Sequence, residues 1–124
     1  MRSFGSYHGI IIEEGLGDRS VLAGMRILGS KRAGTWTLLK VDVDEARIEE
    51  LIGLVQKNLR IEKGVPFYAH FYRRGELIVV FPEKIFHLKP DKVTWKSAVN
   101  YGKSKGIPEE ELDFKPCKFE EETY

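Results

Sequence analysis

Residues 67–88, FYAHFYRRGELIVVFPEKIFHL, contain three runs of β-branched and aromatic side chains separated by two short turns. Such runs predict strands at 67–72, 76–81 and 84–88. A three-residue loop at 73–75 that ends on Gly75 fits a type I turn closed by a left-handed bulge residue. This register pairs Phe71 with Leu77 on one face. The stretch therefore predicts an antiparallel meander with two unlike faces.

The second face of this meander mixes amphipathic and apolar side chains. Its members are Tyr68, His70, Tyr72, Glu76, Ile78, Val80, Ile85 and His87. Tyrosine among aliphatic side chains is typical of protein–protein surfaces. The first hypothesis is therefore a non-enzymatic interaction domain that forms a homodimer through Tyr68, Tyr72, Ile78, Val80 and Ile85.

The same face permits three other interpretations. The first is a small-ligand-binding protein or enzyme with His70 central, since imidazole titrates near neutrality, and with Tyr68, Tyr72 and His87 lining the pocket. A surface that stacks nucleic acid bases is disfavoured, because the basic-glycine-aromatic signature of such sheets is absent. In the last interpretation, residues 15–34 fold across the face and bury it.

The remaining sequence supplies two more strands and two helices. An apolar strand is expected at 8–13 and an alternating strand at 35–43, whereas residues 14–34 carry five glycines and predict only a short helix from Ser20 and an extended segment around Ile27. Asp44 is expected to cap a helix that ends near Leu59, and Asp91 a second helix that ends at Gly106. This order predicts an α+β domain over residues 1–118, a mainly antiparallel sheet of four or five strands with two helices on one face, and a frayed acidic tail at 119–124.

Composition excludes several classes of protein. The 124 residues include 42% hydrophobic and 31% charged residues, and the formal net charge is +1, so nothing favours a nucleic acid or an anionic membrane as partner. The single Cys117 and the lack of an apolar run in residues 1–7 predict a cytoplasmic protein, and no stretch is long enough to span a bilayer. Abundant Lys, Glu and Arg beside a single Gln hint at a thermophilic source.

Catalytic, cofactor and metal motifs are not found in the sequence. His70 and His87 would fall in one row of the meander, but Ile78 stands between them and no third metal ligand is evident. The glycines at 15–17 lack the third glycine of a dinucleotide fingerprint and the Lys of a phosphate loop. The sequence predicts no catalytic residue, no metal and no cofactor.

Three short segments of the chain are similar to sequences of a known family. Residues 100–108 (NYGKSKGIP), 112–114 (LDF) and 11–16 (IIEEGL), together with the meander, resemble a small family of uncharacterised α+β proteins from archaea and anaerobic bacteria. That family has no assigned activity, so the resemblance implies kinship and no catalytic or binding residues.

Overall fold

A computed structural model describes residues 5–124 of the chain, so residues 1–4 of the N-terminal stretch 1–7, in which no apolar leader is expected, lie outside the described residues. The strands of its main sheet are β1 (Ser6–Ile12), β2 (Arg26–Ala33), β3 (Trp36–Asp44), β6 (Ala69–Arg73), β7 (Glu76–Phe81) and β8 (Lys84–Leu88). Within the described residues this sheet has six strands in the order β2-β3-β1-β6-β7-β8, and every neighbouring pair is antiparallel. The α+β class and the antiparallel sheet are confirmed. The sixth strand, beyond the four or five expected, is the polar edge strand β2.

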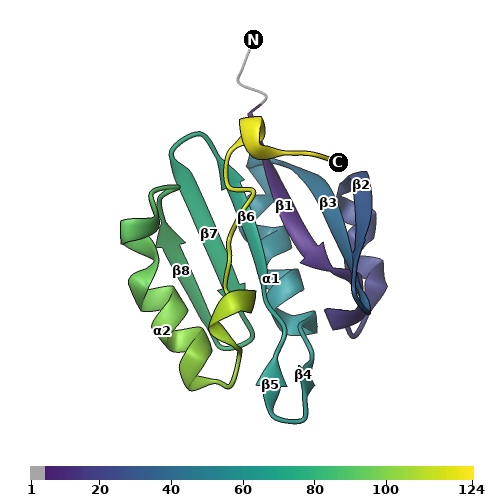
Figure 1. Cartoon of the computed structure of the whole chain (residues 1–124). Helices are drawn as coiled ribbons and strands as arrows, with labels where there is room; N and C mark the ends of the chain where they lie inside the picture. The colour runs from purple at the N-terminus through teal and green to yellow at the C-terminus, as the bar shows by residue number, and fades with distance from the viewer. Residues whose placement is uncertain (1–4) are drawn as a thin grey trace.

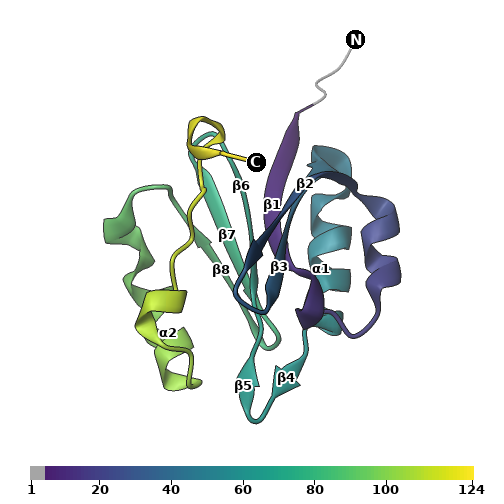
Figure 2. The ribbon, with the colours of Figure 1, turned by 45° about the vertical axis from the view of Figure 1, so that its right-hand side comes forward.

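The two α-helices of the described chain lie on opposite faces of the sheet, not on one face as predicted (Figure 2). Helix α1 (Ile48–Asn58) covers one face, called the α1 face here, and helix α2 (Lys96–Ser104) covers the other, the α2 face. A small hairpin of β4 (Ile61–Glu62) and β5 (Val65–Pro66) projects from one end of the sheet (Figure 1). Short 3-10 helices occupy Glu13–Gly15, Arg19–Gly24, Glu45–Arg47, Lys92–Trp95, Glu109–Glu111 and Phe119–Glu121.

The register of the β6–β7 hairpin explains why the helices are divided. Arg73 pairs with Glu76 across a two-residue turn, so Phe71 lies opposite Ile78 rather than Leu77, and the predicted three-residue loop is wrong. A shift of one residue moves every side chain of β7 to the other face. The prediction assumed that only one face is apolar, but both faces are buried here, so the hydrophobic pattern does not select the register.

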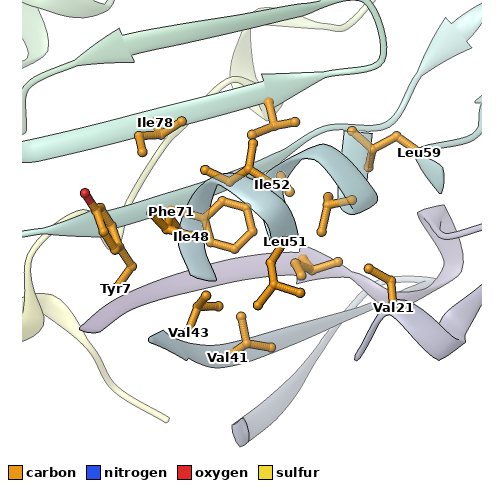
Figure 3. Packing of buried hydrophobic residues seen from close by; sticks show 14 of the residues in the cluster. Tyr7, Val21, Val41, Val43, Ile48, Leu51, Ile52, Leu59, Phe71 and Ile78 are labelled. Atoms are coloured by element: carbon orange, nitrogen blue, oxygen red, sulfur yellow. The ribbon is translucent and has the colours of Figure 1, made fainter. Parts of the chain in front are cut away.

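Helix α1 packs as its sequence spacing predicts. Ile48, Leu51, Ile52 and Val55 are buried against the α1 face, where Phe71 meets them from β6 (Figure 3). Each fully buried aliphatic side chain of this kind contributes about 1.5–3 kcal/mol. The predicted cap differs, because Asp44 makes no side-chain cap bond and its Oδ1 lies 3.3 Å from Nη2 of Arg26.

Helix α2 has both predicted ends. Asp91 accepts a hydrogen bond from the Val93 N–H at 3.1 Å, at the start of the 3-10 turn that leads into the helix. Gly106 has a φ of +96°, and the N–H groups of Gly106 and Ile107 donate to the carbonyls of Lys103 and Gly102 at 3.0 and 3.1 Å. These bonds form a Schellman motif, which needs a left-handed residue at Gly106.

The segment after α2 completes the cover of the α2 face. It runs along the sheet towards the end where β1 begins (Figures 1 and 2), and it buries Leu112, Phe114 and Cys117. Residues 15–34, the expected cover, lie elsewhere: the 3-10 helix Arg19–Gly24 packs on α1, and β2 forms a sheet edge. None of the helices in the described part of the chain is long and apolar enough to cross a membrane.

Candidate functional site

The structure brings together three of the four predicted site residues. Tyr68, His70 and Tyr72 all lie on the α2 face beneath the C-terminal segment. His87 is exposed on β8, and its strand partner is Ile78, which faces α1. The predicted row of His70, Ile78 and His87 is therefore not formed.

The predicted self-association face is divided between the two sides of the sheet. Tyr68 and Tyr72 belong to the cluster under α2, whereas Ile78, Val80 and Ile85 pack in the cluster under α1. Tyr72 and Val80 are fully buried within the chain. The one-residue register shift is the cause, since it reverses the side chains of β7 and β8 relative to β6.

His70 fixes the C-terminal segment to the sheet. Its ring is 3% exposed, and Nε2 lies 2.9 Å from the carbonyl oxygen of Pro116. Burial disfavours the charged imidazolium and lowers the pKa of His70 to about 4. Because a carbonyl oxygen only accepts, the neutral ring carries its proton on Nε2 and donates it. His70 is thus a buried hydrogen-bond donor at neutral pH and is almost completely shielded from solvent.

Polar side chains gather around Glu122 on the same face as His70, and of them only Tyr72 was predicted from the sequence. The carboxylate of Glu122 accepts a hydrogen bond from the Tyr72 hydroxyl at 2.5 Å, and its Oε2 lies 2.6 Å from Nδ1 of His8. The Lys40 ammonium lies 3.5 Å from the other oxygen, Oε1. His8, Lys40 and Tyr72 come from β1, β3 and β6, and we call these three side chains the carboxylate cradle.

The strand register brings the side chains of the cradle to one face of the sheet. His8 is paired with Tyr72 on one side and with Asp42 on the other, and Asp42 is paired with Arg26 of β2. Side chains directly opposite each other in antiparallel strands share a face. Four adjacent strands therefore present a row of polar side chains on the α2 face. In order, the row consists of basic Arg26, acidic Asp42, the imidazole of His8 and the phenol of Tyr72.

The row also orients His8. Nε2 of His8 lies 3.4 Å from Oδ1 of Asp42, so both ring nitrogens face carboxylate oxygens. Asp42 is in turn bonded to Arg26. The imidazole is therefore held from the side opposite Glu122 by groups that belong to the sheet itself.

The cradle is largely shielded from water. The side chains of Lys40, Asp42 and Glu122 are 10%, 10% and 12% exposed. Burial favours the neutral form of the Glu122 carboxyl, but hydrogen bonds from Tyr72 and His8 and the charge of Lys40 outweigh it, and the pKa of Glu122 is lowered. Burial and the neighbouring carboxylate raise the pKa of Tyr72, so its hydroxyl keeps the proton that it donates.

Two aromatic residues of the C-terminal segment close the cradle. The Phe119 ring packs on His8 with ring centres 4.4 Å apart, and the Tyr124 ring lies 5.3 Å from the Lys40 ammonium. Together with Glu122 they hold residues 119–124 against the sheet, where the sequence predicted a frayed tail.

The sequence does contain a signal for this site. Leu39, Val41 and Val43 alternate along β3 and are buried on the α1 face, which leaves Lys40 and Asp42 on the other face of an inner strand. Charged residues at such positions are almost never buried unless they are paired. Glu122 gives no comparable signal, because it lies in an acidic stretch that reads as solvent-exposed.

Neither a metal site nor a reactive thiol is found near the cradle among residues 5–124. No group of three or more His, Cys, Asp or Glu side chains in residues 5–124 is arranged to hold a metal ion. Cys117 is buried, and burial raises the pKa of its thiol to about 11, so the thiol is protonated at neutral pH.

Comparison with known proteins gives no match: no protein family fits the chain, and no curated protein or solved structure is similar to it. Kinship with the archaeal and bacterial family stays a prediction.

Proposed function

We propose that this protein is an interaction domain that binds a carboxylate group of another molecule in the cradle of His8, Lys40 and Tyr72. The observation that carries the proposal is the convergence of three polar side chains from three strands on one shielded carboxylate, that of Glu122. In this state the protein's own C-terminal segment supplies the ligand group.

The chemistry of the cradle suits binding. Hydrogen bonds to an ionised acceptor are about twice as strong as neutral ones, and they strengthen further where water is excluded. Asp42 and the strand register hold His8 in place without help from Glu122. The cradle is therefore expected to keep its shape when Glu122 leaves, which lowers the cost of binding a second carboxylate.

A His70-centred ligand site has less support. The His70 ring is buried, bonded to a backbone carbonyl and shielded by the C-terminal segment. Tyr72 is the one predicted site residue that contacts the carboxylate, through its hydroxyl.

Self-association stays a prediction, which the molecular mass in solution checks. The five residues predicted for it lie on opposite faces of the sheet, so they cannot form one contact surface. Ile27 and Leu28 on the edge strand β2 are 51% and 46% exposed, and β3 is the only strand paired with β2 in the described chain. This edge is the better candidate for a contact between copies.

Chemical rescue tests the carboxylate proposal. The substitution Glu122→Ala removes the bound carboxylate, and we expect it to lower the free energy of unfolding by about 1–3 kcal/mol, since hydrogen bonds to a charged group are lost. Sodium acetate at about 100 mM should then raise the melting temperature of this variant by mass action, because acetate binds the folded state. The wild-type protein should not respond, because its cradle is filled.

Two controls make the rescue specific. Sodium chloride at equal ionic strength should not replace acetate. The substitution Glu120→Ala alters an exposed carboxylate in the 3-10 turn Phe119–Glu121, directly before Glu122, and should give neither the destabilisation nor the rescue. If acetate acts equally on wild type and Glu122→Ala, the cradle does not bind carboxylates and the proposal is overturned.

A further inference from the structure

The last residues of the chain lie on the sheet like a bound peptide. Cys117, which is 1% exposed, is the last residue that is fully buried in the core under α2. Beyond it, Lys118, Glu120 and Thr123 are exposed, and Phe119, Glu122 and Tyr124 make the contacts with the sheet. Opening residues 118–124 gives up the Glu122 bonds and the two ring contacts but leaves the buried core in place, so it costs less free energy than unfolding the core.

Phe119 occupies a rim position that a separate molecule could fill. Its ring packs against His8 at 4.4 Å and against Tyr72 at 6.1 Å between ring centres, and yet 46% of the residue is exposed. Aromatic pairs contribute beyond the area they bury. The two rings therefore offer a site for an aromatic side chain three residues before the bound carboxylate.

Tyr124 occupies a second site on the other side of the cradle. Its ring lies 5.3 Å from the Lys40 ammonium and 5.7 Å from that of Lys31, a cation–π arrangement. Its backbone passes over Gly29, where an added Cβ would lie 3.1 Å from the Tyr124 carbonyl carbon. The glycine thus leaves room for a chain to lie on β2.

Tyr124 does not fill this second site perfectly. Its hydroxyl is buried and has no hydrogen-bond partner within the described residues. An unsatisfied buried hydroxyl costs binding free energy relative to a side chain that lacks it or reaches a partner. An external segment that avoids this unsatisfied hydroxyl can therefore bind more tightly than the internal segment does.

Charge points to the same class of ligand. Residues 120–122 are three consecutive glutamates, and Lys40 pairs with Glu122 while Lys31 lies over the Tyr124 ring that follows. Opposite charges of this kind guide a partner into register and speed its association.

Resting on the proposed carboxylate function, we infer that the ligand is an acidic peptide segment with the pattern aromatic-x-x-Glu-x-aromatic, and that residues 119–124 are its internal competitor. The carboxylate fills the cradle, the first aromatic side chain packs on His8, and the second lies over Lys40. Binding of the external peptide displaces the internal segment and leaves the fold up to Cys117 in place.

The test uses the full chain with Glu122→Ala and a synthetic peptide with the sequence of residues 118–124, KFEEETY, blocked at its N-terminus. Titration followed by NMR should give saturable shifts at His8 and Tyr72. Wild type should bind the same peptide more weakly, because the state in which its own residues 119–124 have left the cradle is only partly populated. Replacing the phenylalanine or the tyrosine of the peptide by alanine should weaken binding about 2- to 10-fold.

Variants of the peptide and of the protein distinguish a failure of the peptide pattern from a failure of the proposed carboxylate function. Alanine at the peptide position that corresponds to Glu122 should weaken binding by about tenfold or more. Tyr72→Phe in the protein should weaken binding of the unaltered peptide similarly. If acetate and the parent peptide bind but both aromatic replacements leave the dissociation constant unchanged, the peptide pattern is wrong and the carboxylate function stands. If the glutamate replacement has no effect and acetate gives no rescue, the carboxylate function itself fails. Dispersed amide spectra of each protein variant confirm that it is folded.

Discussion

Acidification from pH 6.5 to pH 4 is expected to cost the folded protein about 3 kcal/mol of stability through His70 alone. The unfolded chain binds a proton at the ordinary pKa of 6.5, whereas the pKa of the buried ring is about 4. Protons therefore favour unfolding throughout this interval, and the contribution of His70 to stability is intact above pH 6.5 and lost as the pH falls towards 4. The two pKa values differ by about 2.5, and each pKa unit corresponds to about 1.36 kcal/mol.

Urea unfolding of wild type and His70→Gln between pH 7 and pH 4 measures this effect. The glutamine amide can donate to the Pro116 carbonyl as Nε2 does, but it does not titrate. The variant should therefore show a flatter pH profile, and carboxylates with lowered pKa values affect both proteins alike. His87→Gln, which changes an exposed histidine, should leave the wild-type slope intact. Parallel profiles for wild type and His70→Gln would show that the ring is not buried in its neutral form.

Gly9→Ala is expected to destabilise the fold by about 1–3 kcal/mol through overpacking. Gly9 lies opposite Phe71 in the β1–β6 pair, and an added Cβ would come within 2.4 Å of Cδ2 of that ring. Phe71 is fully buried beneath α1 and cannot turn away (Figure 3). The glycine thus lets a large aromatic ring lie flat against an inner strand.

The matched control is Gly53→Ala in α1. Nothing lies within 4 Å of a Cβ at Gly53, and alanine favours a helix interior by about 1 kcal/mol over glycine, so this variant should be more stable than wild type. Urea unfolding measures both. The double variant Gly9→Ala with Phe71→Leu should be less destabilised than the sum of the single changes, since the smaller side chain makes room. A neutral Gly9→Ala would contradict the packing of Phe71 on β1.

Local chemistry made much of the fold predictable. The alternation in β3, the apolar spacing of α1, the Asp91 cap and the left-handed Gly106 depend on neighbours in sequence, and the structure confirms them. The helix faces were predicted wrongly, because they depend on the register of one hairpin. That register follows from the two-residue turn between Arg73 and Glu76, and the hydrophobic pattern does not reveal it because both faces of the sheet are buried.

The site was predictable only in part for the same reason. Tyr68 directly precedes β6, and His70 and Tyr72 alternate along it, so their common face follows from local geometry. The cradle also needs His8 and Lys40, which reach Tyr72 through the pairing of β1 with two distant strands. Its occupant, Glu122, lies 50 residues from Tyr72 along the chain. Contacts over such separations have no signature in periodicity or composition.

The titration of the Glu122 side-chain carboxyl, followed by carbon-13 NMR in wild type and in Tyr72→Phe, tests the carboxylate cradle most directly. The cradle predicts a midpoint below the ordinary value of 4.5 in wild type, because the polar groups around Glu122 favour its charged form. It also predicts a higher midpoint in Tyr72→Phe, which lacks one donor. A wild-type midpoint at or above 4.5 that Tyr72→Phe leaves unchanged would show that Glu122 is not held there.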